Sequence, residues 1–530
     1  MHRKPVWQRG LFITFLVFLS FQGYTQKKQW IKKYPLNIGN SYGDGFSFVK
    51  EDYDKGFFIA NQGVNGSFGI RVYKTDVNGN IMWERFVLSH LDPTLYGAAC
   101  TADGGLVLEG AIGKTDSTND NYLLKINACG QVEWTRIYDL NQYSLGGPIA
   151  VLSNGDIAVS SYVAIAKDTI YNYYNCWTFL TDSKGNIKWQ VFNNLNPWQL
   201  LIDNNENILT TGSCYLPYFK QPNIGVVECG LVKMDTSGKR LWYAEYDVEK
   251  NIAADGVNSA QTSDNGYITL AEQRNENRVM LIKFNSDGAA QWIKLIGDTQ
   301  QYEFCWGISN ANNGAYLVAA GTNIINQFDV YKSDVKLLKI NEQGQVLKQV
   351  IFPDTGEHEW IFYGIGVTSD HKYTLISTGN YGGSLDSLMV LKYNENLELD
   401  TFYTHDTNKY DYLCNHKITF DSTIFLNTSN PLPVTVPFPT DTETIVNPGR
   451  FAIYPNPSLS NNIIHVICPA ANTPTTIAIY DVSGRLVGKY SFTSSNFGQA
   501  HLAPCILAFG CYILVLEQKG KRYMQKLMVE

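Results

Sequence analysis

Short apolar segments alternate with turn residues along most of the chain. Segments such as VYKTDVNGNIMW (72–83), LLKINACGQVEW (123–134) and LIKFNSDGAAQW (281–292) share one order: an apolar strand, Asp or Asn, a turn ending in Gly, and a second strand carrying Trp. These turns recur every 50 to 56 residues, at Gly79, Gly130, Gly185, Gly238, Gly288 and Gly344. A fixed period of this length indicates a repeat architecture.

A second kind of strand lies between these hairpins. DGGLVLEGA (103–111), NGDIAVSSY (154–162) and NGYITLAEQ (265–273) each begin with a turn and continue with small and β-branched residues. A further short apolar stretch, such as YGAACTA (96–102), precedes each one. One period therefore contains four short strands and no helical periodicity. Four antiparallel strands repeated at this interval are typical of a β-propeller blade.

The ends of the repeat region suggest how the ring closes. QWIKKYPL (29–36) matches a Trp-bearing outer strand without a hairpin before it, and 412–430 matches the first two strands of a blade without a hairpin after it. Pairing the N-terminal strand with the C-terminal blade would remove the open sheet edges. The sequence thus predicts an all-β propeller of seven or eight blades over residues 27–430. Seven complete blades and a composite one, made of 412–430 and the N-terminal strand, give eight, which is the preferred number; if 412–430 is only a cap, the ring has seven blades.

The first 25 residues have the order of a secretory signal peptide. Basic residues up to Arg9 precede an apolar run from Leu11 to Phe21, and small residues follow. The run is shorter than the roughly 20 residues that span a bilayer, so we expect no transmembrane segment in the mature chain. Export to an oxidising compartment would allow the ten cysteines to pair. Cys214 and Cys229, which flank one loop, form the favoured local disulfide, and buried thiols are the alternative for most of the others.

The amino-acid composition excludes several classes of protein. The 530 residues are 44% hydrophobic, 13% aromatic and only 17% charged, which excludes a disordered acidic chain and a long charged coiled coil. The net charge is −7, and Lys and Arg are scattered rather than clustered. A phosphate-tracking surface needs clustered basic residues, so we expect no nucleic-acid partner.

The amino-acid composition changes after residue 430. A Pro-rich linker over 431–448 leads to a module at 449–530 whose segments indicate a small Ig-like β-sandwich. YPNP (454–457), IYDVSGR (479–485), Gly510 with Tyr512, and the closing QKLMV (525–529) resemble the type A C-terminal sorting domain of the type IX secretion system. LAPCILAFGCY (502–512) is longer and richer in Cys than the usual approach to this Tyr. The motif positions are Tyr454, Pro455, Asn456, Pro457, Tyr480, Asp481, Gly484, Arg485, Gly510, Tyr512 and Lys526.

The resemblance implies an export route. A Gram-negative cell would send the chain to the periplasm by its signal peptide and across the outer membrane by the type IX machinery, which would read the C-terminal domain. The protein would then be secreted or held at the outer cell surface. Any further function would reside in residues 27–430.

Candidate catalytic and metal chemistry is sparse. The repeated Asp/Asn-x-x-Gly turns resemble calcium loops, but such turns ordinarily close hairpins through the Asp side chain and a left-handed Gly. The hairpin is also similar to the tryptophan-docking repeat of pyrroloquinoline-quinone dehydrogenases, yet it lacks their Thr and their vicinal cysteines. We therefore expect no metal or cofactor, and we expect the recurring Trp to pack between blades. His358-Glu359 and His405-Asp406 are acid–base candidates that loop polarity explains better.

Aromatic residues cluster in the predicted loops of one propeller face. The loops between second and third strands and the loops between blades share that face, which can vary while the blades stay fixed. We hypothesise that part of this set binds a glycan or a peptide, although a chain with 33 Tyr would place some in loops in any case. The favoured function is a non-enzymatic binding or adhesion module, and the alternative is a polysaccharide-active or quinone-dependent enzyme. The candidate binding residues are Tyr171, Tyr173, Tyr218, Phe219, Tyr302, Trp306, Trp360, Tyr363, Tyr410 and Tyr412.

Overall fold

A computed structural model describes most of the repeat region and of the C-terminal module. The described residues are 29–35, 47–64, 68–89, 91–113, 119–140, 142–168, 171–193, 195–215, 227–246, 254–273, 278–297, 303–327, 330–352, 360–361, 365–381, 384–402, 413, 432–435, 452–454, 464–468, 473–494, 499–502, 507–508 and 510–529.

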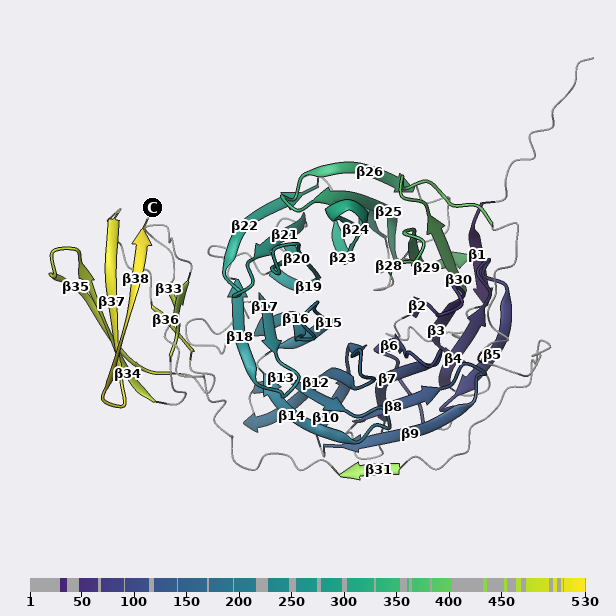
Figure 1. The fold of residues 1–530 in the computed structure, drawn as a ribbon, viewed down its shortest axis with the longest axis horizontal. Coiled ribbons are helices and arrows are strands. Elements are labelled where there is room, and N and C mark those ends of the chain that lie inside the picture. Colours follow the sequence, from purple (N-terminus) through teal and green to yellow (C-terminus); the bar gives the residue numbers. More distant parts are fainter. Residues whose placement is uncertain are drawn as a thin grey trace, which may run out of the picture.

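In the described part of the chain, seven antiparallel blades stand around a common axis, as Figure 1 shows, and the second and third are hydrogen-bonded into one larger sheet. Blades 1 to 3 comprise β2(Ser47–Glu51), β3(Phe57–Val64), β4(Phe68–Thr75) and β5(Ile81–Val87); β6(Gly97–Cys100), β7(Leu106–Gly113), β8(Asn119–Ile126) and β9(Val132–Asp139); β10(Tyr143–Gly146), β11(Ile149–Val151), β12(Ile157–Asp168), β13(Tyr171–Thr181) and β14(Ile187–Asn193). Blades 4 and 5 comprise β15(Asn196–Ile202), β16(Ile208–Tyr215), β17(Val227–Met234) and β18(Arg240–Tyr246); β19(Ala254–Gln261), β20(Tyr267–Gln273), β21(Arg278–Phe284) and β22(Ala290–Ile296). Blades 6 and 7 comprise β23(Phe304–Asn310), η1(Asn312–Gly314), β24(Ala315–Gln327), β25(Val330–Asn341) and β26(Val346–Phe352); β27(Trp360–Ile361), β28(Gly366–Val367), β29(Tyr373–Tyr381), β30(Ser384–Tyr393) and β1(Ile31–Pro35).

The ring closes through the N-terminal strand. β1 pairs antiparallel with β30, from Ile31 opposite Leu391 to Pro35 opposite Ser387. After the turn that follows β30, the chain returns in two isolated bridges, Tyr393 with Leu399 and Gln29 with Thr401, and β1 takes the outer position of blade 7. The N-terminal strand closes the ring, as predicted, but its partner is β30 and not a strand of the 412–430 segment as expected.

Closure at blade 7 also decides the blade number. Trp30 in front of β1 and Val390 of blade 7 share one buried cluster with Val49 and Phe57 of blade 1. Blades 7 and 1 are therefore direct neighbours, and the preference for eight blades is wrong. The predicted extra blade at 412–430 falls, apart from Leu413, outside the described residues.

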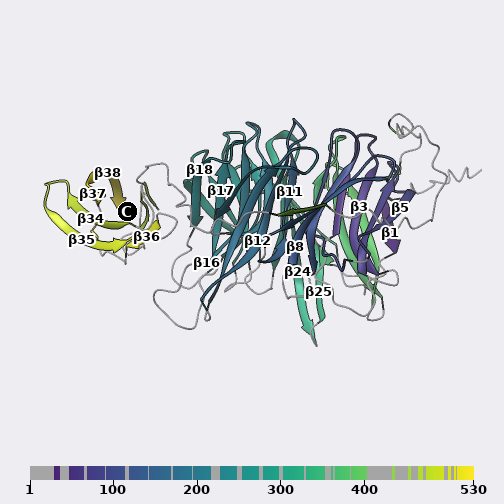
Figure 2. The ribbon, with the colours of Figure 1, turned by 90° about the horizontal axis from the view of Figure 1, so that it is seen from below.

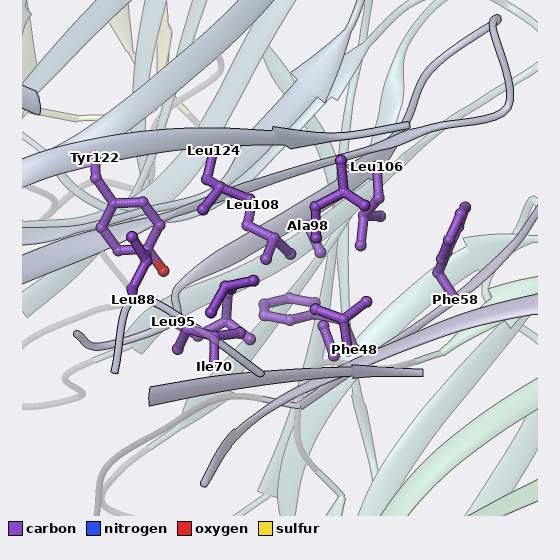
Figure 3. Close-up of a cluster of buried hydrophobic side chains, with 14 of the residues drawn as sticks. Phe48, Phe58, Ile70, Leu88, Leu95, Ala98, Leu106, Leu108, Tyr122 and Leu124 are labelled. Carbon is purple, nitrogen blue, oxygen red and sulfur yellow. The ribbon is translucent and has the colours of Figure 1, made fainter. Parts of the chain in front are cut away.

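Apolar side chains fill each gap between neighbouring blades. Figure 3 shows one such layer, in which Phe48, Phe58 and Ile70 of blade 1 meet side chains of blade 2 such as Leu108 and Tyr122. Strands buried on both faces need apolar residues at successive positions. This explains why the third strand of most blades is largely apolar apart from one recurring Lys.

A recurring Trp packs the outer strand of every described blade except the sixth against the next blade. Trp30 donates its indole N–H to the Val77 carbonyl (3.1 Å), and Trp242 donates to that of Ser286 (2.8 Å). A Cβ on Gly288, whose φ is +81°, would lie 2.8 Å from the Trp242 ring. The turn Gly thus serves both the left-handed backbone and the close approach of the indole. The expectation of inter-blade packing is confirmed.

The seam between blades 6 and 7 is built differently. Lys348 occupies the Trp position of blade 6 and is exposed. Across the seam the turn Gly is replaced by Leu397, which keeps a left-handed backbone (φ 56°) and buries its side chain. The turn rather than the strand therefore supplies the apolar group at this seam.

Buried lysines recur at one position of the third strand. Lys74 lies 2.6 Å from Asp54, Lys233 lies 2.8 Å from Asp203, and each Lys side chain is almost fully buried. The carboxylates come from the turn between the first two strands of the same blade. A buried charge needs such a partner. Equivalent pairs join Lys125 to Asp103, Lys283 to Asp264 and Lys392 to Asp370.

Cys214 and Cys229 do not form the predicted disulfide. In the β16–β17 ladder Cys229 lies opposite Ser213, one position from Cys214, so the two side chains point to opposite faces of the sheet. They belong to different buried clusters, and each is a thiol. Cys129, in a blade 2 turn, is disulfide-bonded.

The C-terminal module is a sandwich of two sheets. β32(Ala452–Tyr454), β33(Ile464–Ile467) and β36(Gln499–Leu502) form one sheet, and β35(Leu486–Thr493), β34(Pro474–Asp481), β37(Gly510–Gln518) and β38(Lys521–Val529) form the other. Ile477, Leu514 and Leu527 lie in the buried layer between them. A further strand, β31(Leu432–Thr435), pairs parallel with the outer strand β9 of blade 2.

Candidate functional site

Three motif residues of the C-terminal module build one hairpin turn. Between β34 and β35, Asp481 Oδ1 accepts hydrogen bonds from the Ser483 hydroxyl (2.6 Å) and from the backbone N–H groups of Ser483 and Arg485 (3.0 Å each). Gly484 supplies the left-handed residue (φ 82°). The hydrogen bonds, above all that of the Ser483 hydroxyl, lower the pKa of Asp481 to about 2. These residues therefore fix the hairpin, as the equivalent Asp and Gly do in the blades.

The remaining motif residues have different environments. Tyr512 is buried and donates its hydroxyl to the Ala508 carbonyl (2.8 Å), whereas Tyr480 is half-buried and Lys526 is exposed. Gly510 begins β37 and Tyr454 ends β32. Pro455, Asn456 and Pro457 lie outside the described residues.

The two longest hairpins in the described part of the chain lie at one end of the propeller. In an antiparallel blade the loops between second and third strands leave the end opposite to the two tight turns. At that end the β12–β13 ladder extends to Asp168 opposite Tyr171, and the β24–β25 ladder extends to Gln327 opposite Val330. Figure 2 shows β24 and β25 projecting beyond the ring. We call this end the loop face and define it by the two hairpins, 157–181 and 315–341.

The structure describes four of the ten candidate binding residues. Tyr171 and Tyr173 lie at alternate positions of β13, beside the tip of the first hairpin. Trp360 lies in β27, opposite Thr378, and Trp306 lies in β23. The other six, and the acid–base candidates His358, Glu359, His405 and Asp406, lie outside the described residues: Tyr218, Phe219, Tyr302, Tyr363, Tyr410 and Tyr412.

Trp306 has an environment of its own. It is half-buried and packs against a cluster that includes Leu317 of blade 6 and Tyr373 of blade 7. Its side chain therefore fills the seam between two blades in addition to any part that it offers to solvent.

A buried carboxyl group lies at the junction of blades 2 and 3. Glu109 of β7 accepts hydrogen bonds from the Asn121 amide (3.0 Å) and from the backbone N–H of Gly147 (2.7 Å). Asn121 continues the network to Ser144 and Ser161. Burial raises the pKa of Glu109 to about 8. A Glu inside the apolar strand LVLEGA is the signal that sequence reasoning passed over.

A second buried carboxylate lies at the start of β23. Glu303 accepts hydrogen bonds from Lys336 (2.7 Å) and from the Thr322 hydroxyl (3.1 Å), and all three side chains are buried. Pairing with Lys336 compensates the charge. The arrangement ties the base of the β24–β25 hairpin to the strand before it.

Within the described ranges no group of three or more His, Cys, Asp or Glu side chains is arranged to hold a metal ion. In the same part of the chain, no helix has the length and apolar character needed to cross a membrane.

Comparisons with known proteins identify the C-terminal module. Residues 452–530 match the family described as a secretion system C-terminal sorting domain. No curated protein matches the chain.

Solved structures with some likeness are distant. A protein of unknown function from Dyadobacter fermentans has 8% identity and a TM-score of 0.40, over 68% of this chain and 98% of that one. A mutant of NanB sialidase from Streptococcus pneumoniae has 10% identity and a TM-score of 0.36, over 68% and 70%. A xylan β-1,4-xylosidase from Bacillus halodurans has 8% identity and a TM-score of 0.30, over 82% and 90%.

Fold and sorting module together define the class of protein. The chain is an all-β propeller protein whose C-terminal module directs type IX export. It is sent to the cell surface or secreted from a Gram-negative bacterium, and its module interacts with the type IX machinery.

Proposed function

We propose that the exported propeller is a non-enzymatic binding or adhesion module, which holds a glycan or a peptide on its loop face. In this proposal residues 27–430 form the binding ring, 431–448 connect it to the sorting module at 449–530, and residues 1–25 are the signal peptide.

The extended hairpins carry the proposal. The β12–β13 and β24–β25 ladders have eleven paired positions each, whereas the corresponding ladders of the other blades have seven to nine in the described residues. A paired hairpin costs less conformational entropy on binding than an open loop of the same length. Tyr171 and Tyr173 stand on one of these hairpins, and aromatic side chains offer flat apolar surface with a polar end to sugars and peptides.

The ring beneath the loop face supports a rigid platform. Glu303, Lys336 and Thr322 tie the base of one hairpin, and the Glu109 network ties blade 2 to blade 3 below the other. A binding surface gains affinity when its supporting side chains are fixed before the ligand arrives.

The test is a binding screen of the exported full chain against immobilised glycans and peptides, with product analysis of every hit. Tyr173→Ala and Trp360→Ala should each weaken binding to a hit by about tenfold, as central aromatic residues of an interface usually do. Leu347→Ala removes an apolar side chain, 57% exposed, from the outer wall of blade 6, and it should leave affinity unchanged.

Three results would contradict the proposal. Equal affinities of all three variants and the wild type would place the binding surface elsewhere. Release of a shortened glycan or an oxidised product would make the protein an enzyme. Absence of any hit across both arrays would remove glycans and peptides as the ligand class.

A further inference from the structure

The outward surface of one sheet in the sorting module is apolar. In β37, Tyr512, Leu514 and Leu516 point into the sandwich core, while Ile513 and Val515 take the opposite side and stay half-exposed. Apolar residues on both sides of a strand are typical of a sheet covered on both faces. Here only the inner face is covered by the described part of the chain.

The strand register gathers these side chains into one patch. Val515 lies opposite Ala478 of β34 and Met524 of β38, and Ile513 lies opposite Tyr480 and Lys526. Opposite residues in a ladder share a face. We define the outer-face patch by six residues, of which Met524 is 74% exposed: Ala478, Tyr480, Ile513, Val515, Met524 and Met528.

Basic residues surround the outer-face patch. Lys489 lies opposite Ala478 on one side, and Lys526 lies opposite Ile513 on the other. Arg485 and Arg522 are more than three-quarters exposed, and each pairs with a carboxylate, Asp481 and Glu517 respectively. Residues 452–530 contain six Lys and Arg against three Asp and Glu, although the whole chain carries a net charge of −7. The module is therefore a basic body on an acidic protein, which favours an acidic partner.

The shape of the patch favours a protein partner over a lipid surface. Its centre consists of Ala478, Ile513 and Val515, which are short side chains on a sheet and only half-exposed. Insertion into a bilayer interface usually relies on protruding aromatic or long apolar side chains, whereas a flat apolar centre with a charged rim is typical of protein interfaces. In Figure 1, β33 and β36 lie between this sheet and the propeller.

We propose that the outer-face patch is the surface by which the secretion machinery reads the module, and that its partner is an acidic protein surface with an apolar centre. This inference rests on the sorting role of residues 452–530. The motif residues Asp481 and Gly484 act through the hairpin that they close, because their side chain and backbone are used within the turn. The side chains that contact the partner are instead those of the outer-face patch and of the basic residues around it.

The test uses the full chain produced in a bacterium with a type IX system. Ile513→Thr with Val515→Thr removes apolar surface but keeps β-branched residues that suit a strand. Ile293→Thr with Leu295→Thr is the matched control, because both side chains are 37% exposed on β22 of the propeller. The exported and periplasmic fractions are compared by immunoblot, and protease resistance reports folding of the periplasmic protein.

We expect the patch variant to remain in the periplasm, folded, with export lowered by about tenfold. The control should be exported as the wild type is. Met524→Thr and Lys489→Glu alter exposed positions that cannot unfold the module, and each should lower export by roughly threefold. Normal export of both of these single variants would overturn the proposal even if the double variant failed to fold.

A chain that ends at residue 451 tests the premise of this proposal, which is that residues 452–530 direct export. Normal export of the shortened chain would refute the sorting role itself. Loss of its export together with normal export of the patch variants would refute the outer-face patch alone. Purified wild-type chain that bound vesicles of anionic phospholipid or lipopolysaccharide, while the Ile513→Thr/Val515→Thr chain did not, would assign the patch to lipid and overturn the protein partner.

Discussion

Closure of the ring can be tested at Trp30. The side chain is fully buried, lies edge-on to Phe57 at a centroid distance of 5.6 Å, and donates its indole N–H to Val77 of blade 1. Truncating a buried aromatic residue to Ala costs about 3–5 kcal/mol, and the carbonyl that loses its donor adds about 1 kcal/mol. Trp30→Ala should therefore lower the free energy of unfolding by about 4–6 kcal/mol.

The matched control is Trp292→Ala in blade 5. Trp292 occupies the equivalent position against Gly344 but is only half-buried, so we expect about half the loss. Denaturant titration followed by Trp fluorescence gives the midpoints, and hydrogen exchange gives the protection of amides 31–35. Trp30→Ala should expose those amides first, because β1 is held to blade 7 by β30 alone. Equal losses for the two variants, with the β1 amides still protected, would refute closure by this strand.

Two further predictions concern buried charges in the ring. Lys74→Met leaves Asp52 and Asp54 buried without their cation and should cost about 3–5 kcal/mol. Lys74→Met with Asp54→Asn should recover part of this. Lys188→Met, at a pair whose lysine is 47% exposed, should cost at most about 1 kcal/mol. Equal losses for Lys74→Met and Lys188→Met in chemical denaturation would contradict the assignment. Glu109 has a folded-state pKa of about 8, above its unfolded value, so its contribution to stability is complete at low pH and is lost as the pH rises through about 8. Glu109→Gln should flatten the stability profile between pH 5 and 9, whatever its absolute stability, and a profile as steep as that of the wild type would exclude Glu109 as its source.

Much of the fold could be predicted because each blade repeats the same local rules. Asp/Asn-x-x-Gly turns close their hairpins through local hydrogen bonds, so Gly79 and Gly288 mark blade positions in the sequence alone. The Trp contacts followed from the same period, since a residue repeated once per blade meets the same neighbour each time.

The misses involve contacts between distant parts of the chain. The preference for eight blades came from counting 412–430 as the start of a blade, whereas β1 pairs with β30 and the ring closes between blades 7 and 1. The Cys214–Cys229 pairing failed because closeness in sequence does not show which face of a strand a side chain takes. The buried Lys–Asp pairs were overlooked because Lys usually indicates a solvent-exposed position.

The candidate sites also differ in how far local sequence could predict them. The sorting motifs could be recognised from local sequence because they specify a turn and two strands. The outer-face patch needed the register of three strands before Ile513, Val515 and Met524 could be placed together. The loop-face residues come from separate blades, and no linear spacing brings Tyr173 and Trp360 to a common position.

The most direct test of the central claim is hydrogen exchange of the exported chain with and without a ligand from the binding screen. A binding propeller predicts slower exchange in the two loop-face hairpins, 157–181 and 315–341, with no chemical change in the ligand. Protection confined to the tight turns around Gly79 and Gly288 at the opposite end, or conversion of the ligand to a product, would contradict it.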